Sequence, residues 1–197
     1  MSRIGLIVLA VVVTGCAIET LRWYQPSGTG VAEERHCGGP KEVMSFRLNE
    51  AGTILKISIE PAHRDKQLGR TKPTVIYSMT LGPNTSVHII DPVLVVLSPE
   101  GAELSQYRFK TLNAPGFKSV AATTQLQYDA HGPNSANPRL AVLDNHYSVF
   151  ITLDNLPERF HVRYPRLIIN GTQHSGQVVS YASSEGSFLR HRCLTGT

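Results

Sequence analysis

The chain has 197 residues, with 19 Lys and Arg against 15 Asp and Glu, and its formal net charge at pH 7 is +4. This length suffices for one hydrophobic core of ordinary size. The charge is only mildly basic, which excludes the dense basic patch of a nucleic-acid-binding domain, and we expect no nucleic acid among the partners.

The first fifteen residues have the three parts of an export signal. Arg3 supplies an early positive charge, Ile4 to Val13 form an uninterrupted apolar run, and Thr14 and Gly15 are the small residues of a cleavage site. Ten helical residues rise about 15 Å, roughly half of a bilayer core, so the run is too short to span a membrane. Residues 1–15 are therefore predicted to be a signal peptide.

The end of the apolar run reads Val13-Thr14-Gly15-Cys16. This order resembles the lipobox of bacterial lipoproteins. The resemblance implies that the Cys16 thiol carries a diacylglycerol, that the chain is cut just before Cys16, and that the new amino group is acylated. Several acyl chains would hold the protein at a membrane surface. The alternative is an ordinary signal peptide in which Cys16 is incidental.

The residue after the cysteine is Ala17. In lipoproteins an Asp at this place often signals retention at the inner membrane, so the resemblance implies an outer-membrane lipoprotein that faces the periplasm. The inference assumes a bacterium with two membranes.

Two further cysteines, Cys37 and Cys193, remain after Cys16 is lipidated. An even pair in an exported protein predicts a disulfide. A metal site with His36 and His191 is the alternative, but adjacent residues of an extended chain point in opposite directions, so His36 and Cys37 would chelate one ion poorly. We predict no bound metal and no cofactor.

Residues 16–36 are predicted to form a lipidated flexible tether, because they contain the run Pro26-Ser-Gly-Thr-Gly. Trp23 and Tyr24 precede this run, and their amphipathic rings suit either the membrane interface or packing against the folded domain. Residues 37–197 then form a single domain.

From Cys37 onward apolar residues alternate with polar ones, which predicts half-buried strands. Leu55, Ile57 and Ile59 show the pattern, and the turn at residues 49–52 suits a hairpin. We predict strands at 43–48, 53–60, 74–81, 86–90, 93–98, 104–109, 123–129, 140–144, 148–153, 160–164, 166–170 and 177–183.

Many short strands separated by turn residues favour an all-β fold, an antiparallel β-sandwich that is immunoglobulin-like in outline. Turns are predicted at residues 81–84, 98–101, 154–157 and 170–172, which contain Gly, Pro, Asn and Asp. A lipocalin-like β-barrel is the alternative.

Residues 61–73 form a long predicted loop with Arg64, Lys66, Arg70 and Lys72 against one acid, Asp65. Long loops on a rigid scaffold often carry binding sites. These four cations are the candidate ligand-binding residues for an anionic envelope component, such as a lipid phosphate or a cell-wall carboxylate. The alternative is a solvated surface loop.

No catalytic motif of a known kind is present, and we name no catalytic residue. His161 and Arg163 fall on one face of a predicted strand, which indicates a solvent face. The Asp-Asn pairs at 144–145 and 154–155 suit turns or a calcium ion.

The sequence thus predicts a lipid-anchored envelope lipoprotein with a non-enzymatic binding or envelope-assembly role. The alternatives are a periplasmic hydrolase or transferase with a site assembled only in the fold, and a carrier of a small apolar ligand. A titratable group with a shifted pKa at the floor of a pocket favours the enzyme. An exposed apolar patch or open sheet edge favours the binding protein.

Overall fold

The computed structural model describes residues 18–34, 39–61, 72–128 and 145–189. Their strands form three antiparallel sheets. The five-stranded sheet has the order β1 (Ile18–Ser27), β16 (Val178–Leu189), β13 (Arg159–Arg163), β7 (Val93–Leu97) and β8 (Glu103–Arg108).

The seven-stranded sheet has the order β10 (Lys118–Ala121), β9 (Thr111–Ala114), β12 (His146–Thr152), β5 (Thr74–Thr80), β4 (Ile54–Glu60), β3 (Lys41–Arg47) and β2 (Val31–Glu34). The four-stranded sheet has the order β11 (Leu126–Tyr128), β6 (Thr85–Ile89), β14 (Leu167–Ile169) and β15 (Thr172–His174). One turn of 3-10 helix, η2 (Pro115–Phe117), joins β9 to β10. No helix in these four ranges has the length and apolar character needed to cross a membrane.

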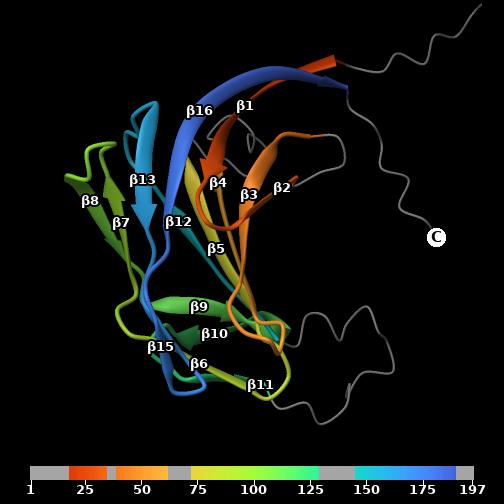
Figure 1. Ribbon diagram of the computed structural model, residues 1–197, viewed down its shortest axis with the longest axis vertical. Helices are drawn as coiled ribbons and strands as arrows, with labels where there is room; N and C mark the ends of the chain where they lie inside the picture. The colour runs from red at the N-terminus through yellow and green to blue at the C-terminus, as the bar shows by residue number, and fades with distance from the viewer. Residues whose placement is uncertain (1–17, 35–38, 62–71, 129–144, 190–197) are drawn as a thin grey trace, which may run out of the picture.

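The five-stranded and seven-stranded sheets face each other, and the four-stranded sheet lies across one end of the pair (Figure 1). The predicted antiparallel β-sandwich is confirmed. The three sheets are open, so the alternative of a lipocalin-like barrel is wrong for the described part of the chain. Each sheet buries one face and closes the core from a different side.

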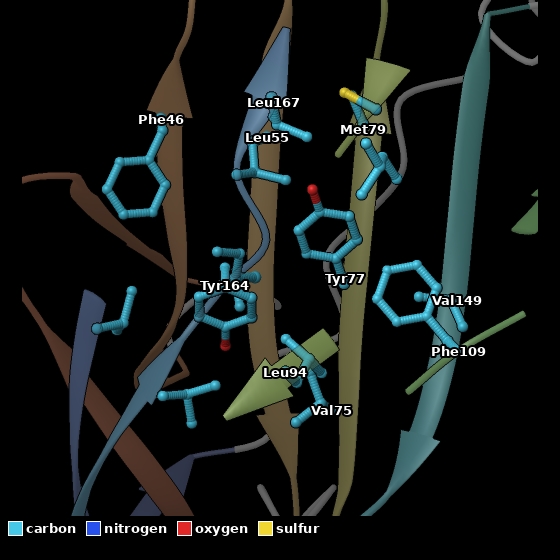
Figure 2. Packing of buried hydrophobic residues seen from close by; sticks show 14 of the residues in the cluster. Phe46, Leu55, Val75, Tyr77, Met79, Leu94, Phe109, Val149, Tyr164 and Leu167 are labelled. Atoms are coloured by element: carbon cyan, nitrogen blue, oxygen red, sulfur yellow. The ribbon is translucent and has the colours of Figure 1, made fainter. Parts of the chain in front are cut away.

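Aromatic side chains join the sheets at the centre of the core. Tyr77 of β5 stacks on Tyr164, which follows β13, with ring centroids 5.8 Å apart. Phe109, which follows β8, packs against the other side of Tyr77 at 6.1 Å (Figure 2). Tyr164 and Tyr181 share a hydrogen bond of 3.0 Å between their hydroxyl groups. These residues hold the two facing sheets together.

The alternating patterns place the residues that they predict in the core. Leu55, Ile57 and Ile59 of β4 are all buried. The turn at 49–52 forms as predicted, with the Thr53 backbone N–H donating to Asn49 Oδ1 at 2.9 Å and Gly52 at a φ of +85°. Only glycine adopts such a φ without strain.

The prediction of a flexible tether over residues 16–36 is wrong for the part that the structure describes. Residues 18–27 form β1, which pairs with β16 at ten successive positions. Pro26 is tolerated because β1 is an edge strand, where a missing N–H breaks no ladder bond. Gly30 packs closely on β3: a Cβ there would lie 2.7 Å from the Ser45 carbonyl oxygen. The Ser-Gly-Thr-Gly run is therefore a packed turn.

Other strand predictions differ from the structure in detail. The strand expected at 123–129 is only Leu126–Tyr128, and the last predicted strand continues to Leu189. The strands β1, β2, β9, β10 and β15 are not predicted from the sequence. The strand expected at 140–144 lies outside the described residues.

Candidate functional site

A pocket of about 390 Å³ opens beside β8, which has no partner strand on its outer side among the described residues and so forms one edge of the five-stranded sheet. One wall is β8 itself, and the other is the turn between β12 and β13. The lining residues are Val96, Leu104, Ser105, Gln106, Tyr107, Asp154, Asn155, Leu156 and Pro157. The pocket therefore lies on an open side of the sandwich.

The lining of this edge pocket includes apolar side chains beside polar ones. Val96 of β7 is buried, and Leu156 packs against the main core. Leu104, which also lines the pocket, leaves 51% of its surface exposed. Such an arrangement can accept an apolar side chain.

Polar groups fix the rim of the pocket. The Asp154 backbone N–H donates to the Tyr107 hydroxyl oxygen at 2.9 Å, so Tyr107 keeps its own O–H available as a donor. Lys72 Nζ lies 2.5 Å from Asp154 Oδ1. The hydrogen bond to Asp154 and the charge of this carboxylate raise the pKa of Lys72. Both groups are exposed, so this ion pair positions the turn more than it stabilises the fold.

Of the four cations proposed to bind an anion, the structure describes only Lys72. Its charge is compensated by Asp154, so at this position the pairing favours a structural role. Arg64, Lys66 and Arg70 lie outside the described residues, and their binding role stays a prediction. The same holds for the predicted lipidation of Cys16 and for the predicted disulfide between Cys37 and Cys193.

The sequence predicts only that His161 faces solvent, but in the structure its ring also contacts two other elements. Its Nδ1 lies 2.8 Å from Ser180 Oγ, and its Nε2 lies 3.2 Å from the Pro99 carbonyl oxygen. A neutral ring with its proton on Nε2 donates to Pro99 and accepts from Ser180. The imidazole thus links the β7–β8 turn to β16. The sequence hides this contact because it depends on the pairing of His161 with Ser180 across β13 and β16.

The Asp154-Asn155 pair forms a turn, which was one of the two roles considered for it. Asn155 has a φ of +37°, and Asp154 engages Lys72 and Tyr107. Asp144 lies outside the described residues. Within the described part of the chain, no three His, Cys, Asp or Glu side chains cluster as a metal site would require.

Comparison with known proteins found no match for this chain among protein-family models, curated proteins or solved structures.

Proposed function

We propose that this protein is a lipid-anchored lipoprotein of the bacterial cell envelope and that it binds another envelope component without catalysing a reaction. The observation that supports this proposal is the pocket beside β8, which combines apolar lining residues with a strand that has no partner on one side in the described part of the chain. Open edges invite pairing with another chain, and proteins usually protect them.

One edge of the other large sheet, formed by β2, has such protection, and its second edge is β10. The strand β2 has four residues, a register shift between Glu33 and Glu34, and an ion pair of 2.7 Å between Glu33 and Lys56. Charges and bulges of this kind discourage strand addition. The contrast with the pocket beside β8 favours β8 as the edge that receives a partner.

The same geometry favours the binding protein over a hydrolase or transferase. The carboxylate in the pocket lining, Asp154, is exposed and paired with Lys72. The histidine with a shifted pKa is His146, whose pKa is lowered by burial. His146 is not a lining residue, because its ring contacts Thr80 on β5, at 3.1 Å. A carrier of a small apolar ligand needs the enclosed interior of a barrel, and the described sheets are open.

The anchor is tested by changing the predicted lipid site. Cys16→Ala should move the protein from the membrane fraction to the soluble fraction, because no acyl chain would remain. Ala17→Asp should keep the lipid and move the protein from the outer to the inner membrane. Fractionation after a high-salt wash measures both. If Cys16→Ala still sediments with membranes, the lipoprotein proposal is wrong.

The binding role is tested by photo-crosslinking in the native membrane. A photoreactive residue at Ser105, in the pocket, should give one discrete adduct with an envelope protein. The same residue at Gln173, exposed on β15 at the far end of the sandwich, is the matched control and should give none. Equal labelling from both positions would contradict a site at β8.

A further inference from the structure

The backbone of β8 presents its free hydrogen-bonding groups at defined residues. The Phe109 N–H donates to the Pro92 carbonyl oxygen at 3.0 Å, so these two residues are a hydrogen-bonded pair of the β7–β8 ladder. In antiparallel strands such pairs alternate with pairs whose N–H and C=O groups point away from each other. Because Val93 lies opposite Arg108 and Val95 lies opposite Gln106, the backbone groups of Gln106 and Arg108 face the open edge.

The side chains of β8 define which residues of an added strand would enter the pocket. Four successive residues of β8 line the pocket, namely Leu104, Ser105, Gln106 and Tyr107. Of these, Ser105 and Tyr107 are half-buried and face inward, and Tyr107 packs against the core. Directly opposite residues of two antiparallel strands place their side chains on the same face of a sheet. A residue opposite Ser105 or Tyr107 would therefore point toward the inner side of the pocket, whereas a residue opposite Gln106 would lie on the outer face with Leu104 and Gln106. The edge fits a strand with an apolar residue at every second position.

The two ends of the β8 edge carry charges of opposite sign. Glu100 and Glu103 stand at the β7–β8 turn, both exposed, and neither forms an ion pair with Lys or Arg among the described residues. Hydrogen bonds to Ser98 and to its own backbone lower the pKa of the Glu100 carboxyl, and the His161 ring, the basic group that acts on Glu100, helps to lower it by its charge. At the other end Arg108 is neutralised by Asp91 at 2.8 Å, and the exposed Lys110 has no acidic partner in the same ranges. The edge is therefore acidic where β8 begins and basic just after it ends.

We propose that β8 accepts an extended segment of another envelope protein as an antiparallel sixth strand of this sheet. The segment carries acidic residues toward its N-terminal end, basic residues toward its C-terminal end, and alternating apolar residues that enter the pocket. Antiparallel pairing opposes the N-terminal end of the segment to Lys110 and its C-terminal end to Glu103. The inference rests on the proposed function and specifies the partner's chemistry.

A second copy of this chain fits the charges but not the pocket. The strand β8 itself runs from Glu103 to Arg108, so two copies could pair antiparallel by charge. The half-buried residues of β8 are Ser105 and Tyr107, so a second β8 would present a serine and a tyrosine to the pocket and no alternating apolar residues. We therefore assign the site to a different protein.

The test uses the lipidated protein in detergent micelles and a synthetic peptide of alternating Thr and Val with Asp residues at its N-terminal end and Lys residues at its C-terminal end. Gln106→Pro removes the outward N–H, and proline is tolerated at an edge position of this kind. Gln106→Thr is the matched control, because threonine keeps the N–H. Fluorescence anisotropy measures affinity, amide chemical shifts locate the contact, and circular dichroism melting checks the fold.

We expect the wild type and Gln106→Thr to bind alike, and Gln106→Pro to bind at least about tenfold more weakly, which corresponds to about 1.4 kcal/mol. The peptide with its terminal charges exchanged should also bind more weakly, and the difference should shrink at high salt. Equal binding by Gln106→Pro, no binding to the wild type, or a dimer formed through β8 would each overturn strand addition. The Ser105 crosslink and the Cys16 fractionation report separately on the proposed function, so the two failures are distinguishable.

Discussion

Tyr77 is a buried residue whose polar hydroxyl group lies in an apolar environment. Its side chain is almost fully buried, and its hydroxyl group has no hydrogen-bond partner in the described part of the chain. Burial alone raises the pKa of this phenol. A buried polar group without a partner costs about 1–3 kcal/mol of folding free energy. The stacking of the Tyr77 ring on its aromatic neighbours offsets that cost.

The first prediction at this scale compares two Tyr→Phe changes. Tyr77→Phe should leave the free energy of unfolding unchanged or raise it, because it removes only an unpaired hydroxyl. Tyr181→Phe should lower it by about 1–3 kcal/mol, because it leaves the Tyr164 hydroxyl without the partner it has at 3.0 Å. Denaturant unfolding followed by the fluorescence of Trp23, the only tryptophan, measures both. A larger loss for Tyr77→Phe would contradict this account.

The second prediction concerns acid stability and His146. Burial lowers the pKa of this ring below its ordinary value of about 6.5. Between the lowered folded pKa and about 6.5 the unfolded chain binds more protons than the folded one, so stability falls as the pH falls through that window. Above that window the effect is absent.

His146→Asn cannot be protonated there and should flatten this part of the stability–pH profile. His174→Asn, a change of the half-buried histidine on β15, is the matched control. Unfolding midpoints from about pH 8 to pH 5 measure the slopes. If the slope of the His146→Asn profile equals that of the wild type, another group causes the acid sensitivity.

Among the elements, β1 is the strand whose role differs most from expectation. Tyr24 packs edge-to-face on Phe160, with ring centroids 5.6 Å apart, and burial raises its pKa. Trp23 lies on the opposite face of the strand and donates from Nε1 to Gln25 at 3.0 Å. The two neighbouring aromatic residues therefore have different roles, and for Tyr24 the packing favours the folded domain over the membrane interface.

Tyr24→Ala should lower the free energy of unfolding by about 2 kcal/mol, since a half-buried aromatic ring contributes less than the 3–5 kcal/mol of a fully buried one. Trp23→Ala should cost less, about 1 kcal/mol, because Trp23 is also half-buried but is not among the residues that pack against the core. Thermal unfolding followed by circular dichroism compares them. Equal losses would mean that β1 does not place the two rings on different faces.

The difference between what the sequence predicts and what it hides is also clearest at the level of elements. The strand β4 was predicted because Leu55, Ile57 and Ile59 alternate with polar residues. The strand β1 was missed because its pairing depends on a contact across 163 residues, shown by the Arg22–Glu185 ion pair of 2.7 Å. The pocket was missed for the same reason: Tyr107 and Asp154 are 47 residues apart and meet only in the folded sandwich. Local periodicity shows which side chains share one face of a strand, but it does not show which other strand that strand pairs with.

At the scale of the whole molecule, the predicted disulfide between Cys37 and Cys193 would close nearly the entire domain as one loop. The chain-entropy model gives about 4–5 kcal/mol for a loop of that length. Mass spectrometry of the unreduced mature protein should find no free thiol at either position, and reduction should lower the unfolding midpoint. Two free thiols, or zinc that a chelator removes, would refute the bridge.

The pairing of β1 with β16 has a mechanical consequence. These strands are antiparallel, so the start of β1 and the end of β16 lie side by side at one end of the molecule (Figure 1). A force that separates these two ends would break the ladder one residue pair at a time, which requires little tension. A force between a lipid on Cys16 and a partner on β8 would instead cross β16, β13 and β7, in the order of the sheet. If that pull runs along the strands, each ladder is sheared and all of its hydrogen bonds bear the load together. A molecule held between the membrane and a partner on β8 would therefore withstand a tension that would separate β1 from β16 if it were applied to their two adjacent ends.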